Sequence, residues 1–401
     1  MGEEENNPVN KLLKKKISRR EFLKYSFIGI GGLATSAYGY NHLFSRSSGS
    51  LPDIFPNSAP DTLWKWSKEA LYYKQINENV QCELCPHECS LAPDDRGICR
   101  TRVNKDGKLY SLAYGNPCSV HVDPIEKKPL FHFLPSSSIF SIATAGCNLR
   151  CLNCQNWQIS QFQPEETNNY DLMPETVVNA AIQKNCKSIA YTYSEPVIFY
   201  EYMYDTSKIA KQQGLKNVMV TAGYINEKPF RDLCKVIDAA NIDLKGFSEK
   251  IYNKLNGATL EPILNTLKIA KEEKLWFEMT NLIVPTWTDN LDMIREMCQW
   301  LHKNGLDDYP LHLSRFSPMY KLTHIQPTPI NVLNNARKIA MDEGLKYVYI
   351  GNVPGTEAEN TFCPRCGRIV IGRKGYLITE KNLSNGNCKF CGYKIAGVWN
   401  V

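Results

Sequence analysis

The chain lacks the features that mark several classes of protein. None of its 401 residues lie in a run of 18 consecutive apolar residues, which excludes a conventional membrane-spanning helix. Its 47 basic and 41 acidic residues leave a net charge of only +6, too mild to indicate a nucleic-acid-binding protein. With 43% hydrophobic and 22% charged residues it also lacks the bias of disordered, coiled-coil or collagen-like chains. The sequence therefore predicts a globular protein, long enough for two or three domains.

Residues 1–50 are predicted to be a leader and linker rather than part of the fold. Basic residues at 11–16 precede the heptapeptide S-R-R-E-F-L-K at 18–24, and a mildly apolar, glycine-rich run follows at 25–40. This segment resembles a twin-arginine export signal, with a cleavage point near Ala37. The resemblance implies a periplasmic or membrane-tethered protein. An ordinary basic amino terminus, and hence a cytoplasmic protein, is the alternative.

The body of the chain is predicted to have three parts. A short helix over 62–73 opens a loop-rich, cysteine-rich domain at 61–135. Residues 138–352 alternate between strand-like and helical patterns, which favours a partial or full parallel (β/α) barrel. The expected strands are 139–144, 188–193, 217–220, 240–244, 276–284, 311–316 and 347–350, and the expected helices are 175–185, 197–213, 228–236, 260–273, 291–304 and 330–343. Residues 360–401 form a second small cysteine-rich domain, so the fold class is α/β with small metal domains at both ends.

Cysteine is the one residue in excess, and its spacing indicates metal sites rather than disulfides. The strongest signal is C-N-L-R-C-L-N-C, which places Cys147, Cys151 and Cys154 on one loop directly after the first barrel strand. Three thiolates on a tight loop suit an iron–sulfur cluster. The next cysteine is Cys186, so one iron is expected to stay open for a substrate. Zinc with a distant fourth ligand is the alternative.

The cluster loop, with Q-N-W-Q-I-S after it at 155–160, resembles the radical S-adenosylmethionine (SAM) superfamily, in its branch related to pyruvate formate-lyase activating enzymes. Three further motifs are similar to the AmmeMemoRadiSam-type subfamily: C-E-L-C-P-H-E-C at 82–89, D-P-I-E-K-K-P-L at 123–130 and G-N-V-P-G at 351–355. The resemblance runs from about residue 70 to the carboxyl terminus. One departure is Asn153, which stands where the superfamily usually carries an aromatic residue against adenine.

The resemblance implies that a [4Fe–4S] cluster on the three cysteines binds SAM and cleaves it to a 5′-deoxyadenosyl radical that abstracts hydrogen. It implies that Glu195, at the end of the second strand, accepts the amino group of SAM, and that Thr221 and Gly223 contact the ribose. Asp243 and Lys245 either contact SAM or pair with each other. Glu278, Asn281, His312 and Arg315 are expected to line the pocket, and no catalytic residue is assigned.

Two further cysteine sets flank the barrel. Cys363, Cys366, Cys388 and Cys391 form two C-x2-C knuckles, which suit a closed tetrahedral zinc site, with rubredoxin-like iron as the alternative. Cys82, Cys85, Cys89 and Cys99 fit zinc or a second [4Fe–4S] cluster, and His87 within this set could replace one thiolate. Cys118 is unpaired and could supplement either site. Cys186, Cys234 and Cys298 are expected to be small buried residues.

The sequence therefore predicts a radical SAM enzyme of unidentified substrate, either a protein glycyl residue or a small molecule. An electron donor similar to flavodoxin or ferredoxin is the expected partner, and neither a nucleic acid nor a stable membrane span is expected. The alternative is an exported iron–sulfur protein that only transfers electrons. A barrel of about 210 residues argues against it, because a carrier needs no such scaffold.

Overall fold

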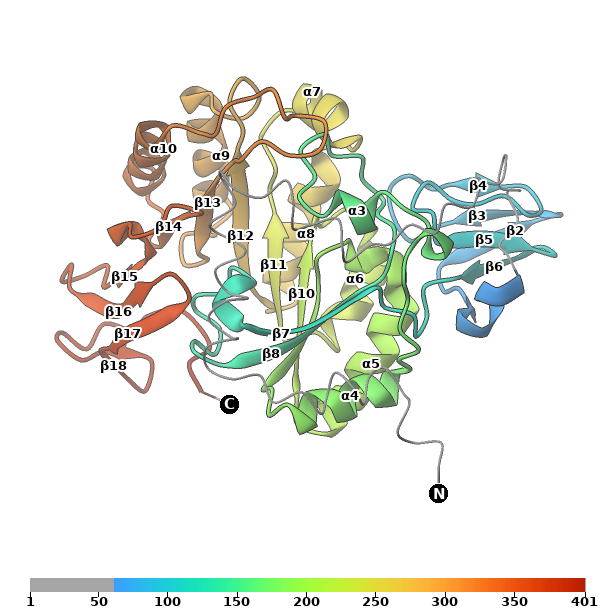
Figure 1. Ribbon diagram of the computed structural model, residues 1–401. Helices are drawn as coiled ribbons and strands as arrows, with labels where there is room; N and C mark the ends of the chain where they lie inside the picture. The colour runs from blue at the N-terminus through green and yellow to red at the C-terminus, as the bar shows by residue number, and fades with distance from the viewer. Residues whose placement is uncertain (1–60, 401) are drawn as a thin grey trace, which may run out of the picture. The chain divides into compact units, whose positions relative to one another are not determined.

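The centre of the molecule is an open sheet of eight strands (Figure 1), in a computed structural model that describes residues 61–400. The strand order is β14-β13-β12-β11-β10-β9-β8-β7, so β7 and β14 are edges and the barrel is partial. Strands β8 to β14 run parallel, and β7 pairs antiparallel with β8. The strands are β7 (Ser119–Pro124), β8 (Ser138–Ala143), β9 (Ser188–Tyr191), β10 (Lys216–Thr221), β11 (Ala239–Asp243), β12 (Trp276–Ile283), β13 (Leu311–Arg315) and β14 (Val348–Gly351).

Helices follow the parallel strands and cover the outer face of the curved sheet (Figure 1). They are α4 (Pro174–Gln183), α5 (Tyr200–Gln212), α6 (Glu227–Cys234), α8 (Glu261–Glu272), α9 (Leu291–Lys303) and α10 (Ile330–Asp342). Helix α9 shows why these segments are helical. Asn290 caps it by accepting the Met293 N–H at 2.9 Å, and its buried residues Ile294, Met297, Cys298 and Leu301 recur every three or four positions. All seven predicted strands and all six predicted helices are thus confirmed.

The helix predicted over residues 62–73 is wrong. A 3₁₀ turn at Asp61–Trp66 is followed by strand β1 (Lys68–Glu69), and Tyr72 has φ +58°, which a right-handed helix cannot accommodate. Here the chain forms two three-stranded sheets, β1-β6-β5 and β2-β3-β4. Their other strands are β2 (Tyr73–Ile76), β3 (Asn79–Cys82), β4 (Ser90–Leu91), β5 (Arg102–Lys105) and β6 (Lys108–Ser111). The tryptophans that suggested a helix instead pack on this sheet, with Trp64 edge-on to Tyr110 at 5.4 Å.

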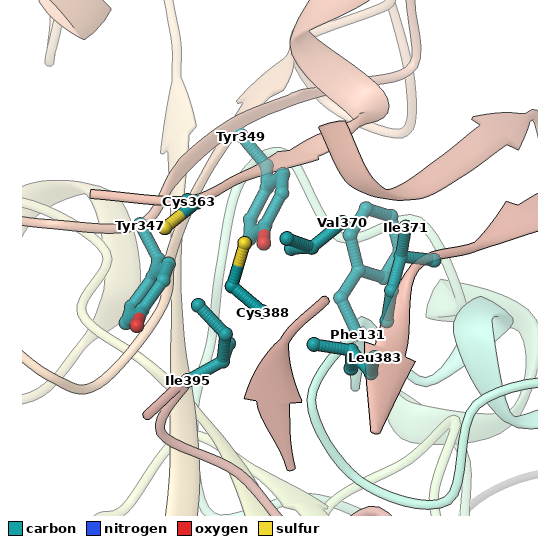
Figure 2. Packing of buried hydrophobic residues seen from close by; sticks show 9 residues of the cluster. All are labelled: Phe131, Tyr347, Tyr349, Cys363, Val370, Ile371, Leu383, Cys388 and Ile395. Atoms are coloured by element: carbon teal, nitrogen blue, oxygen red, sulfur yellow. The ribbon is translucent and has the colours of Figure 1, made fainter. Parts of the chain in front are cut away.

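The carboxyl-terminal residues form short strands around a shared apolar cluster (Figure 2). Strands β15 (Thr361–Phe362), β16 (Ile369–Lys374) and β17 (Leu377–Lys381) make one sheet, and β18 (Leu383–Ser384) pairs with β19 (Asn387–Cys388). Their buried side chains Val370, Ile371 and Leu383 share the cluster with Tyr347 and Tyr349, which come from the segment of β14. This packing places the carboxyl-terminal part against the barrel.

A buried polar network closes the barrel at the amino ends of its strands. The carboxylate of Glu278, early in β12, accepts the backbone N–H groups of Phe131 and His132 at 2.9 and 2.7 Å. His312 Nε2 lies 2.7 Å from the same carboxylate. Glu278 and His312 therefore face this structural plug, and the expectation that they line a cofactor pocket is wrong. Asn281 donates to the Leu244 carbonyl, and Arg315 donates to the Thr328 carbonyl.

The buried network around Glu278 contains His132, from which we predict a pH dependence of stability. Burial lowers the pKa of His132 to about 4, and its ring nitrogens lie 2.6 Å from the Ala396 carbonyl and 2.5 Å from the Tyr349 hydroxyl. Because the unfolded histidine titrates near pH 6.5, its stabilising contribution is complete above that pH and is lost as the pH falls towards 4. We expect this one residue to account for about 2 kcal/mol of the stability lost between pH 7 and pH 5. Denaturant unfolding of the parent and of a His132→Gln variant at both pH values measures it, and an equal loss in the two proteins would contradict the assignment.

Candidate functional site

The loop after β8 carries Cys147, Cys151 and Cys154 and lies at the carboxyl ends of the parallel strands, where such folds place their chemistry. Neighbouring segments hold its backbone. Arg150 N–H and Leu152 N–H donate to the carbonyls of Asn256 and Leu255 at 2.7 and 2.9 Å. The Asn156 side chain donates to the Tyr193 carbonyl, and the Asn148 side chain donates to the Tyr224 carbonyl. The loop is therefore fixed by segments that follow β9, β10 and β11.

Each of the three thiols has a polar neighbour at hydrogen-bond distance. The Leu149 N–H donates to the Cys147 sulfur at 3.3 Å, and the Asn256 side-chain amide donates to the Cys151 sulfur at 3.2 Å. The Cys154 sulfur lies 3.0 Å from the Ser160 hydroxyl. Donors directed at sulfur stabilise negative charge there, as a metal-bound thiolate requires.

Burial raises the pKa of both Cys147 and Cys151. Coordination to iron removes a thiol's proton outright, so thiols with raised pKa values suit a metal rather than solution chemistry. Cys186 precedes β9 and so lies at the opposite end of the sheet from the loop. The chain thus brings three cysteines together here and keeps the next one in sequence away, as a [4Fe–4S] cluster with one open iron requires.

Glu195 joins the loops that follow β9 and β10. Its carboxylate is 3% exposed and accepts the Thr221 hydroxyl at 2.5 Å, the Ala222 N–H at 2.7 Å and the Val197 N–H at 3.2 Å. Burial raises its pKa, although these hydrogen bonds oppose that shift. The charge of the Glu195 carboxylate also raises the pKa of the Cys147 thiol, so this carboxylate acts electrostatically on the cluster loop.

The other predicted cofactor contacts lie on the same edge of the sheet. Thr221 ends β10 and its hydroxyl oxygen also accepts the Gly223 N–H at 3.0 Å. Lys245 Nζ donates to Asp243 at 2.7 Å, so these two residues pair with each other at the end of β11. The pair raises the pKa of Lys245 against the opposing effect of burial, which keeps a positive charge near Cys151. Sequence and structure therefore agree on the position of these groups, and their contacts with SAM stay predictions.

The carboxyl-terminal cysteines form a compact set of four sulfurs. The sulfurs of Cys363, Cys366, Cys388 and Cys391 all lie within 4.8 Å of one another. Cys363 and Cys391 are 3.5 Å apart, and Cys366 and Cys388 are 3.8 Å apart. A tetrahedral ion with metal–sulfur bonds of about 2.3 Å places its sulfurs roughly 3.8 Å apart, so this geometry fits a single four-thiolate ion.

The amino-terminal cysteines are arranged differently. Cys82, Cys85, Cys89 and Cys99 line one cavity, together with Arg102 and Asn148 among others. Within the described chain, the carboxyl-terminal set is the one group of three or more candidate ligands whose atoms all lie within 4.8 Å of one another. No three of the amino-terminal sulfurs therefore lie that close together. His87 Nε2 lies 2.7 Å from the Asn148 carbonyl, so this nitrogen is engaged elsewhere. The Cys118 thiol donates to the Ala143 carbonyl and does not line the cavity.

Several residues of the site were missed by sequence reasoning. Asn256 and Ser160 contact cluster-loop sulfurs, yet Asn256 is 105 positions from Cys151 and no motif marks it. Arg150 lies inside the cluster motif and its guanidinium donates to the carbonyls of Cys147 and of Ile98. Its position among the cysteines of the motif is the one signal that could have identified it.

The fold and the three-cysteine loop define an α/β enzyme of the iron–sulfur class. A sequence model of the Radical SAM superfamily matches residues 141–301. An uncharacterized protein of Methanocaldococcus jannaschii is 49% identical over 333 residues, which cover 82% of this chain and 98% of that protein. The pyruvate formate-lyase 1-activating enzyme of Escherichia coli is 23% identical over 51% of this chain and 89% of its own.

Among solved structures, a radical SAM methyltransferase from Sphaerobacter thermophilus aligns with 78% of this chain and 86% of its own, with 12% identity and a TM-score of 0.46. The family to which this chain belongs is shown by the family model and the sequence relatives, and not by this structural alignment. This chain belongs to the radical SAM superfamily and is related to the pyruvate formate-lyase activating enzymes.

Gly146 provides a test of how the cluster loop is seated. Its φ is +100°, and a Cβ at this position would lie 2.5 Å from the Cys99 carbonyl oxygen. Gly214 has φ +76° and open space within 4 Å of the position that a Cβ would take, so Gly214→Ala costs only the backbone strain, about 1–2 kcal/mol. We expect Gly146→Ala to lose clearly more stability than Gly214→Ala in thermal unfolding, and to retain less iron. Equal losses in both properties would show that the loop does not need this close approach.

Proposed function

We propose that the protein reductively cleaves SAM and uses the resulting radical to abstract hydrogen from a substrate. Cys147, Cys151 and Cys154 would hold a [4Fe–4S] cluster with one open iron. When bound and reduced by one electron, this cluster supplies the cleavage of SAM to methionine and a 5′-deoxyadenosyl radical. The observation that carries the proposal is the loop itself, in which three partly buried thiols each meet a polar neighbour and no fourth cysteine of the same loop is present.

The strand-end residues would bind and orient SAM. Glu195 presents a buried carboxylate beside Cys147, which suits an ammonium group because a carboxylate can accept more hydrogen bonds than the three it holds here. Thr221 and Gly223 lie on the adjoining loop and are proposed to contact the ribose. Asp243 and Lys245 offer one charge of each sign at the next strand end, for the hydroxyl or carboxylate groups of SAM.

Asn153 is proposed to contribute a hydrogen bond where relatives of this superfamily stack an aromatic ring. Its side-chain oxygen is buried and has no hydrogen-bond partner within the described chain. A buried acceptor without a partner costs about 1–3 kcal/mol. A donor on bound SAM would remove that cost, and the amino group of adenine is such a donor.

The proposed substrate class rests on the sequence relatives and not on the geometry of the site. The pyruvate formate-lyase activating enzymes among the relatives favour a protein glycyl residue, and a small molecule is the alternative. A flavodoxin- or ferredoxin-like protein would supply the electron. An electron-transfer protein without SAM chemistry is the second candidate function, favoured by the number of cysteine sets alone.

The flanking segments at 61–135 and 360–401 are proposed as small metal domains that pack against a catalytic barrel at 138–352. Zinc is the proposed ion at Cys363, Cys366, Cys388 and Cys391, supported by their tetrahedral spacing and by the two C-x2-C knuckles. The site has a structural role, because four thiolates leave the ion no open position.

The twin-arginine-like segment falls within residues 1–50, outside the described part of the chain. Among residues 61–400, no helix is both long and apolar enough to span a bilayer. We propose export by the twin-arginine route, supported by the heptapeptide at 18–24 and by the cofactors that folded export would carry.

The proposed reaction is tested by anaerobic reconstitution of the full chain with iron and sulfide. After reduction with dithionite, we expect SAM to yield 5′-deoxyadenosine, quantified by liquid chromatography. A Cys151→Ala variant should give none, because it removes one of three cluster ligands, while Cys298→Ala, which lies in α9, should match the parent. A parent protein with a full complement of iron and bound SAM but no product would favour the electron-transfer function.

The role of Glu195 is tested by Glu195→Gln, which removes the charge and keeps the shape. We expect SAM binding to weaken roughly 10- to 100-fold, because a hydrogen bond to a charged group contributes about 1.5–3 kcal/mol. Glu126→Gln is the matched control, since Glu126 is also buried but accepts the Ser136 N–H near the other end of the sheet. Calorimetric titration with SAM under anaerobic conditions measures both. Unchanged affinity in Glu195→Gln would assign this carboxylate to structure alone.

A further inference from the structure

The four amino-terminal cysteines line an internal cavity. Cys82 and Cys99 are buried, Cys85 and Cys89 are partly buried, and all four line the same cavity. They come from the β3 strand end, the following loop and the turn before β5. The fold therefore brings four thiols from three local segments to one enclosed position.

The spacing of these sulfurs distinguishes them from the zinc-like set. Four thiolates on one ion must lie roughly 3.8 Å from one another, as the carboxyl-terminal sulfurs do. In a [4Fe–4S] cluster each thiolate binds a different iron at the corners of a cube, so the sulfurs lie farther apart. Neither the amino-terminal set nor Cys147, Cys151 and Cys154 contains three sulfurs within 4.8 Å of one another. The two sets thus share the wider spacing.

The wall of the cavity contains a buried cation, Arg102. Arg102 is 2% exposed and pairs with Glu201 at 2.6 Å, yet its Nε has no hydrogen-bond partner within the described chain. A buried cation with a free donor in a cavity lined by thiols favours an anionic group there. A cluster bound by four thiolates is such a group.

The cavity lies directly against the loop of the first cluster. The Cys99 carbonyl occupies the space that a Cβ on Gly146 would need, and Gly146 precedes Cys147. Arg150 joins the two sets, because its guanidinium donates to the Cys147 carbonyl at 3.0 Å and to the carbonyl of Ile98. Asn148, which follows Cys147, forms part of the cavity wall. Backbone contacts therefore place the two cysteine sets side by side.

We propose that Cys82, Cys85, Cys89 and Cys99 bind a second [4Fe–4S] cluster that passes electrons to the cluster on Cys147, Cys151 and Cys154. The second cluster takes one electron from an external one-electron donor, which is oxidised, and returns to its oxidised state when the first cluster is reduced. No bond forms or breaks and no proton moves. Binding of the second cluster does not depend on the proposed function, whereas its role as a relay rests on that function.

The test is a metal count on full-length protein purified without oxygen. The parent is expected to hold about eight irons and about one zinc per chain. A Cys147→Ala/Cys151→Ala/Cys154→Ala variant should keep about four irons. A Cys186→Ala/Cys234→Ala/Cys298→Ala variant, which removes three cysteines outside all three sets, should match the parent. A cluster-loop variant with no iron and about two zinc ions would overturn the proposal, because it would assign zinc to the amino-terminal site.

A second variant covers the case in which the triple variant does not fold. Cys89→Ala/Cys99→Ala keeps the cluster loop and should lose about four irons with no loss of zinc. Loss of zinc with unchanged iron would overturn the proposal. If the parent and the cluster-loop variant both hold about four irons, the second cluster stands and the proposed function fails.

The relay is tested by electron paramagnetic resonance after dithionite reduction. Two neighbouring reduced clusters broaden each other's signals, so the parent spectrum should differ from the sum of the two single-site variants. A parent spectrum equal to that sum would overturn the relay.

Discussion

The structure depends on how one buried, irregular loop satisfies its own polar backbone. Residues 144–156 contain no strand, so their N–H and carbonyl groups cannot pair in the sheet, and leaving them unpaired inside the protein would be costly. Asn256, Leu255, Tyr193 and Tyr224 provide the partners, from three segments that follow different strands. The same contacts fix where the three thiols lie. The site and its support are therefore one network.

The amino ends of the parallel strands, opposite the cluster loop, hold a buried structural network. Glu278 uses both carboxylate oxygens to hold the backbone at Phe131 and His132, and His312 completes the network. Arg373 from β16 donates to the Phe131 carbonyl at 2.7 Å, which ties the carboxyl-terminal part to the same plug. Glu278 and His312 thus have structural contacts near the amino ends of their strands, whereas Thr221 and Asp243 lie at the carboxyl ends of theirs.

This division explains what sequence reasoning could and could not obtain. Hydrophobic periodicity located all seven parallel strands and the six helices that cover the sheet, because those patterns are local. The cysteine spacing located three thiol sets for the same reason. Depth along a strand is also readable, and it places Asp243 at a strand end and Glu278 near a strand start. The missed features are long-range: strand β7 at the sheet edge, the Asn256 contact with Cys151, and the sheets that replaced the helix at 62–73.

Sequence spacing left the metals undecided, and the two flanking cysteine sets differ in their three-dimensional spacing. Two sets begin with the same C-x2-C pair, at 82–85 and 363–366, yet of these two only the carboxyl-terminal one closes to single-ion distances. The difference in spacing arises from where the other two cysteines of each set lie in the chain. Cys388 and Cys391 come back as a second knuckle, and their sulfurs lie 3.8 and 3.5 Å from those of Cys366 and Cys363. Cys89 and Cys99 come from separate turns, and Asn148 of the cluster loop lines the same cavity. The two sets therefore differ in how their later cysteines reach the first pair, which the spacing of the first pair does not reveal.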